Sequence, residues 1–198
     1  FTQTTNSSGR TTFALIGNSN YTVAAVYKGT RVSYVPLVSL QVSDVTLGLT
    51  CTVFDWVVKV YDSAWDETIA GAKVSIDSAT TSDSSISDAL GRAVFSNEPQ
   101  GLYTVTVRYQ GLKIGERVIN LDSQGREDSM NTTMFDLIVG CLDVSERPAV
   151  GVAVKLWNST GMLLGEKQTG LDGRAKFKNL PGLTQYRAEA FFQGLSLI

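Results

Sequence analysis

Alternating apolar and polar positions recur along the chain and predict β-strands. Between Tyr103 and Tyr109 every second residue is apolar, and the residues between them are Thr or Arg. This period of two is expected of a strand with one buried face. Segments 21–27 and 186–192 repeat the pattern, and no useful length of chain has helical spacing. Short strands separated by Gly, Asn, Asp and Ser predict an all-β sandwich.

The predicted strands belong to a longer internal repeat. A Gly-Arg turn followed by a short strand occurs three times, with its glycines at Gly9, Gly91 and Gly173. These turns are evenly spaced, roughly 80 residues apart, which is the size of a small domain and exceeds a solenoid repeat. The segments that begin at Tyr21, Tyr103 and Tyr186 follow in the same order, and further matching blocks lie upstream of the turns. We therefore interpret the chain as tandem domains.

The repeat predicts three domains of unequal completeness. Residues 1–51 match the C-terminal part of a β-sandwich domain, residues 52–133 a complete one, and residues 134–198 the N-terminal part of a third. Broken domains would expose unpaired strand edges. Either the segment belongs to a longer polypeptide, or neighbouring copies complete the broken domains by strand exchange.

The predicted domains are joined without a flexible spacer. Segment 47–58 (LGLTCTVFDWVV) runs from the end of one repeat directly into the first strand of the next. A short apolar joint allows little bending. We expect an elongated rod.

Composition excludes several classes of function. The chain has no histidine, which removes the usual metal ligand and the usual general base near neutral pH. A net charge of −2 without a basic stripe argues against nucleic-acid binding. The acids Asp83 and Asp88, and a second group at Asp122, Glu127 and Asp128, lack the ligand spacing of a calcium loop. We expect no catalytic residue, metal or cofactor, and any membrane anchor would lie outside this segment.

Two of the repeats resemble a known family. The segments AGAKVSI (70–76) and DALGRAVFSNEPQGLYTVTVRYQG (88–111), with their counterparts at 150–156 and 169–194, are similar to the carboxypeptidase regulatory-like, or transthyretin-like, Ig-like β-sandwich. The resemblance implies such a fold in both later domains. Its members serve as stalks, adhesin repeats, surface-layer pieces and enzyme appendages, as in archaeal and bacterial cell-surface proteins.

A related family, the collagen-adhesin B-type repeat, forms a lysine–asparagine isopeptide crosslink assisted by a buried glutamate. Lys59 occupies the position of that lysine, but Val107 stands where the glutamate is expected. In the third repeat Gly140 and Ala190 take these positions. We expect no crosslink.

The two cysteines do not occupy equivalent positions. Cys51 lies at the first junction and Cys141 in the opening strand of the third repeat. If the domains stack end to end, their separation exceeds the Cα distance of a disulfide. We expect two buried thiols, and a bridge to another chain stays open.

Four glycosylation motifs and two tryptophans are the remaining candidate sites. The acceptors are Asn6, Asn20, Asn131 and Asn158, of which Asn20 and Asn158 are expected in turns. Trp56 is expected in the core. Trp65, in an interstrand loop, could contact a sugar or a neighbouring chain, although a flap over its own domain is the simpler interpretation. Trp157 is a second candidate contact.

These features favour a non-catalytic structural component of an extracellular cell-surface assembly, such as a surface layer, stalk or filament. Its partners would be other copies of itself, other cell-surface proteins and N-linked glycans. Two alternatives stay open: an adhesin or carbohydrate-binding module, and a spacer of an extracellular enzyme.

Overall fold

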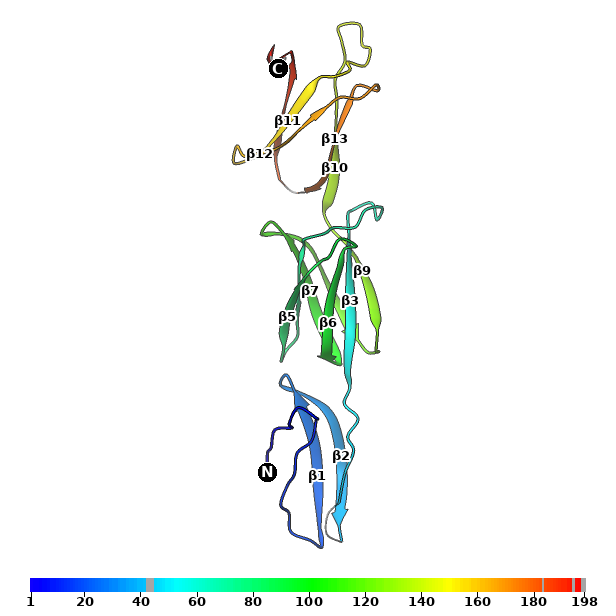
Figure 1. Ribbon diagram of the computed structural model, residues 1–198, viewed down its shortest axis with the longest axis vertical. Coiled ribbons are helices and arrows are strands. Elements are labelled where there is room, and N and C mark those ends of the chain that lie inside the picture. The colour runs from blue at the N-terminus through cyan, green and yellow to red at the C-terminus, as the bar shows by residue number, and fades with distance from the viewer. Residues whose placement is uncertain (42–44, 183, 194, 197–198) are drawn as a thin grey trace. The chain divides into compact units, whose positions relative to one another are not determined.

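The computed structural model describes residues 1–41, 45–182, 184–193 and 195–196. All regular elements in this part of the chain are strands (Figure 1), so the all-β prediction is confirmed. No helix among these residues could cross a membrane. The chain divides into two compact units, Phe1–Val53 and Phe54–Ile198.

The first unit contains one antiparallel hairpin. Strand β1 (Ser19–Tyr27) pairs with β2 (Thr30–Leu40). The turn between them holds Lys28 at φ 47° and Gly29 at φ 75°, which are the two positive φ values that a tight type I′ hairpin turn requires. Tyr21 and Val23 lie half-buried on the same face of β1, in agreement with the predicted alternation.

The second unit begins with a sandwich of two sheets. One sheet has the order β6-β3-β9, in which β3 (Val53–Tyr61) lies between β6 (Arg92–Pro99) and β9 (Arg126–Asn131) and pairs parallel with β9. The other has the order β5-β4-β7-β8, formed by β5 (Ser82–Ile86), β4 (Lys73–Asp77), β7 (Gly101–Tyr109) and β8 (Leu112–Leu121).

One apolar core fills the space between these two sheets. Trp56 from β3, Phe95 from β6 and Val105 from β7 are 0%, 3% and 0% exposed. Tyr103 also lies in the core, its ring centroid 5.7 Å from that of Trp56. The predicted inward faces of Trp56 and of the strand from Tyr103 to Tyr109 are therefore confirmed.

Two further sheets follow, and their strands succeed one another along the chain in the same order as those of the first sandwich. Strand β10 (Met134–Gly140) pairs with β13 (Arg174–Pro181), and the second sheet has the order β12-β11-β14-β15. Its strands are β12 (Leu163–Gln168), β11 (Ala153–Asn158), β14 (Tyr186–Phe192) and β15 (Leu195–Ser196). Val154, Leu156, Ala175 and Phe177 are the buried residues of the core between these sheets.

A tyrosine hydroxyl closes a corner near the start of three strands. Tyr103 Oη donates to the Pro99 carbonyl at 2.7 Å, and Tyr186 Oη donates to that of Pro181 at 2.6 Å. Tyr21 Oη donates to the Ile16 carbonyl at 2.9 Å. These are the tyrosines that begin the three matching segments of the sequence, so each has a local structural role besides packing.

Candidate functional site

The joint between β9 and β10 is the first candidate site. Only Thr132 and Thr133 separate the two strands. The backbone N–H groups of both threonines are bonded, that of Thr132 to the Tyr61 carbonyl at 3.0 Å and that of Thr133 to the Ile114 carbonyl at 2.8 Å. The hydroxyls of both threonines donate to the same two carbonyls. The joint is therefore short, and it is hydrogen-bonded to both sheets of the preceding sandwich.

Further contacts link the loop after β3 to the strands that follow the joint. The Ser63 N–H donates to the Met134 carbonyl at 2.9 Å. The Lys178 ammonium on β13 pairs with the Glu67 carboxylate. The hydrogen bond to Asp136 is the main cause of the raised pKa of Lys176, and the charges of Glu67 and Asp66 raise this pKa further. Charge and backbone hydrogen bonds thus both act across this joint.

The first unit ends with a similar bond. Thr52 N and Thr52 Oγ1 both donate to the Val32 carbonyl on β2, at 2.8 Å and 3.1 Å. Thr133 makes the same pair of bonds to Ile114 on β8. Thr52 and Thr133 therefore make the same hydrogen bonds to the hairpin that precedes each of them.

Trp65 lies on the loop after β3, held in an unusual backbone conformation. Its φ is 64°, its side chain is 49% exposed, and its ring centroid lies 5.6 Å from that of Tyr61. The buried Asp62 carboxylate orders the loop by accepting the N–H groups of Asp66 and Glu67. The same Asp62 carboxylate raises the pKa of Asp66 through a hydrogen bond. Trp65 therefore covers Tyr61 with one part of its ring and offers the rest to solvent.

The four candidate acceptor asparagines differ in local structure. Asn6 and Asn158 each cap a turn: Ser8 Oγ donates to Asn6 Oδ1 and Thr160 Oγ1 donates to Asn158 Oδ1, both at 2.7 Å. Asn131 ends β9 and is exposed. The expectation of a turn at Asn20 is wrong, because Asn20 lies inside β1, where it pairs with Ser39.

The cysteines are free, but they are not both buried as expected. Cys51 is exposed, because it lies in the extended segment before β3 and not in a strand. Cys141 is half-buried beside the core of the last two sheets, and burial raises the pKa of its thiol.

The candidate acids are engaged by neighbouring basic groups or by backbone. Arg126 pairs with Asp122 at 2.8 Å and with Asp128 at 2.7 Å. The ammonium of Lys59 lies 2.7 Å from the Glu127 carboxylate. Asp88 Oδ1 accepts the N–H of Arg92 at 2.8 Å, which makes it a turn cap. Within the described ranges no three acidic or thiol groups gather as metal ligands would.

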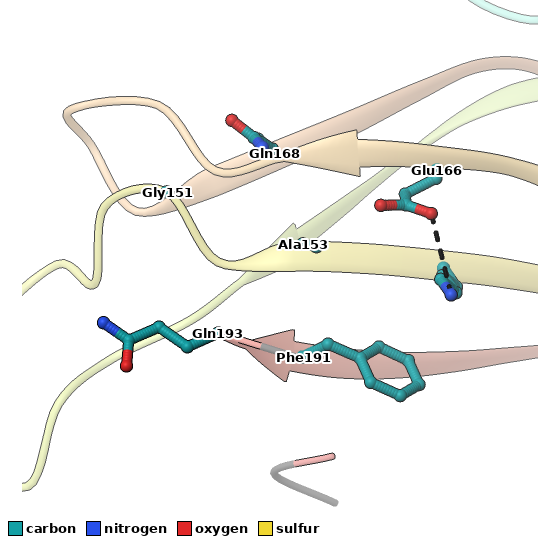
Figure 2. A pocket seen from close by; sticks show the side chains of 7 residues that line it. Gly151, Ala153, Glu166, Gln168, Phe191 and Gln193 are labelled. Carbon is teal, nitrogen blue, oxygen red and sulfur yellow. Dashed lines mark ion pairs between the residues drawn. The ribbon is translucent and has the colours of Figure 1, made fainter. Parts of the chain in front are cut away.

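A hollow lies on the outer face of sheet β12-β11-β14-β15. Figure 2 shows Ala153 at its floor, with side chains from three strands around it. In the strand register, Ala153 stands between Gln168 on β12 and Phe191 on β14. Sequence reasoning missed this site, since it depends on which residues of distant segments become neighbours. The lining residues are Gly151, Ala153, Lys155, Glu166, Gln168, Phe191 and Gln193.

Trp157 lies on the same outer face, farther along β11. It pairs in register with Arg187, whose guanidinium carbon lies 4.9 Å from the Trp157 ring centroid. Arg187 also pairs with Glu189 at 3.2 Å. The face therefore combines aromatic and charged side chains, and Trp157 is part of it.

Comparison with known proteins yields only remote structural likenesses. No family model matches the chain, and no curated protein sequence matches it significantly. The Bacillus anthracis TIE protein aligns at 16% identity and a TM-score of 0.36, over 72% of this chain and 31% of that one. GBS52, the minor pilin of Streptococcus agalactiae, aligns at 13% identity and a TM-score of 0.34, over 70% and 83%. The shaft pilin SpaA from Lactobacillus rhamnosus GG aligns at 11% identity and 0.36, over 71% and 88%. At such values these likenesses carry no functional argument.

Proposed function

We propose that the chain is a non-catalytic structural component of an extracellular cell-surface assembly, such as a surface layer, stalk or filament, built from tandem Ig-like β-sandwich domains. The observation that carries this proposal is the joint between β9 and β10. Two residues connect the strands, and both are hydrogen-bonded to the preceding sandwich through Tyr61 and Ile114. A joint of this kind resists bending more than a flexible linker does. Such a joint suits a chain that holds position or bears load.

The domain boundaries 1–51, 52–133 and 134–198, and membership of the carboxypeptidase regulatory-like family, form part of the proposal. Repetition of the Gly-Arg turn, the corner tyrosine and the junction threonine supports both. Other copies of the chain, other cell-surface proteins and glycans on Asn6, Asn20, Asn131 and Asn158 are the partners we propose. An elongated rod remains our expectation for the shape.

Location can be tested on the source organism. Antibodies raised against the chain should label the outside of intact cells in electron micrographs, and surface proteolysis should remove the label. Label confined to the cell interior would contradict the proposal.

Stiffness can be tested separately on the 198-residue chain by small-angle scattering. A Gly-Ser insertion between Thr132 and Thr133 should broaden the distribution of sizes relative to the parent. The matched control carries the same insertion at Ala79–Thr80, in the exposed turn between β4 and β5, and should scatter like the parent. Equal scattering from all three chains would show that the joint does not confer stiffness.

A further inference from the structure

The hollow around Ala153 arises because a small residue occupies this position of the sheet. The two four-stranded sheets of the second unit are paired alike: Lys73 stands between Ile86 and Arg108, as Ala153 stands between Gln168 and Phe191. Cross-strand neighbours on one face lie about 5 Å apart, so the central side chain fills the space between its neighbours. Lysine at the first site supplies a long side chain, whereas alanine at the second supplies one methyl group.

The walls of the hollow offer both donors and acceptors without a net charge. Gln168 and Gln193 each carry an amide that can donate and accept. The Lys155 ammonium and the Glu166 carboxylate lie 3.7 Å apart, so their charges cancel. At this distance a ligand hydroxyl can accept from the ammonium and donate to the carboxylate.

The aromatic side of the hollow is held by a contact between Lys155 and Phe191. The ammonium of Lys155 lies 4.8 Å from the ring centroid of Phe191, an attractive cation–π arrangement that holds both side chains at the rim. Side chains ordered in advance lower the entropic cost of binding. The rest of the half-buried Phe191 ring can pack against C–H groups.

We propose that this hollow binds one unit of a neutral oligosaccharide. A sugar ring presents hydroxyl groups to the amides and to the ion pair, and C–H groups to Phe191 and Ala153. An apolar ligand would leave the amides without partners, and a charged ligand would meet a like charge on Lys155 or Glu166. This inference goes beyond the structural role proposed above, and does not depend on it.

The test is a titration of the 198-residue chain followed through its amide ¹H–¹⁵N spectrum. The probes are maltotriose, cellotriose and mannotriose, added separately. At least one of them should produce saturable shifts at the amides of Ala153, Gln168 and Phe191. Absence of saturable shifts with all three, or saturable shifts confined to other strands, would overturn the proposal.

Two variants replace residues of the hollow by their counterparts in sheet β5-β4-β7-β8, which are Lys73 for Ala153 and Arg108 for Phe191. Ala153→Lys fills the floor and Phe191→Arg removes the aromatic wall, and each should weaken binding at least about tenfold. Lys73→Ala, on the face of β4, is the matched control and should bind like the parent. The dispersion of the amide spectrum reports whether each variant is folded. Undiminished affinity in a folded Ala153→Lys variant would also overturn the assignment.

Discussion

The indole Nε1 of Trp56 donates a hydrogen bond to the Asp128 carboxylate, with 2.9 Å between Nε1 and Oδ2. The two residues lie on β3 and β9, the parallel pair that closes one side of the first sandwich of the second unit. Arg126 Nε donates to the same carboxylate oxygen at 2.7 Å. The bond from Trp56 to Asp128 satisfies the indole N–H of a tryptophan that is otherwise enclosed by apolar side chains.

Replacement of Trp56 by Phe should lower the free energy of unfolding by about 2 kcal/mol, because the hydrogen bond is lost and the smaller ring leaves a void. Trp157→Phe is the matched control: Trp157 lies on an outer face, so its loss should change stability by no more than about 0.5 kcal/mol. Urea unfolding followed by circular dichroism measures both. Equal losses would show that burial and the Asp128 bond do not distinguish the two tryptophans.

Gly91 is required by close packing as well as by its backbone angle. Its φ is 71°, and a Cβ there would lie 2.7 Å from the Val60 carbonyl oxygen. Gly91→Ala should therefore cost about 3 kcal/mol. Gly125 has a φ of 66° and open space around it, so Gly125→Ala should cost only about 1 kcal/mol. Thermal unfolding separates the two, and a Gly91→Ala variant as stable as Gly125→Ala would refute the steric argument.

The hydroxyl of Tyr103 should make stability depend on pH in alkaline solution. Burial, with a further contribution from Glu98, raises the pKa of Tyr103 to about 12, above its ordinary value of about 10. The folded state therefore favours the neutral phenol. The stabilisation of the folded state by the neutral Tyr103 phenol, relative to the ionised form, is complete below the pKa of Tyr103 in the unfolded state. It is lost as pH rises through the pKa of Tyr103 in the folded state and amounts to about 3 kcal/mol in all.

A Tyr103→Phe variant removes this titration together with the bond to Pro99, which should cost about 1 kcal/mol near neutral pH. The difference in unfolding free energy between parent and variant should shrink and then change sign between about pH 9 and about pH 12. Measuring the difference cancels the contributions of other alkaline groups. A constant difference over this interval would mean that Tyr103 titrates normally.

The two thiols should react at different rates. Cys51 is exposed, whereas partial burial of Cys141 raises the pKa of its thiol and so reduces the thiolate that reacts. At mildly alkaline pH, iodoacetamide should modify Cys51 at least about tenfold faster than Cys141. Mass spectrometry of the Cys51→Ser and Cys141→Ser variants assigns each rate. Similar rates in the two variants would contradict the difference in burial.

Some local predictions failed because they depended on neighbours that lie far away along the chain. Asn20 was expected in a turn from its local composition, yet β2 offers Ser39 as a strand partner and draws it into β1. Burial of Cys51 is expected because free thiols are usually buried, but the segment before β3 forms no strand in which to bury one face. The residues near a position in the sequence do not show which distant strand will pair with it.

The sequence by itself determined the strand class, the inward faces of Trp56 and of the strand from Tyr103 to Tyr109, and the turns at Gly9, Gly91 and Gly173, because a period of two and a glycine at positive φ are local requirements. Only the tertiary structure decided which strands are neighbours. It brought Trp56 to Asp128, closed the joint through Thr133 and Ile114, and placed Ala153 between Gln168 and Phe191. These relationships join segments that are distant in the chain, and so they follow from the pairing of strands and not from any local pattern.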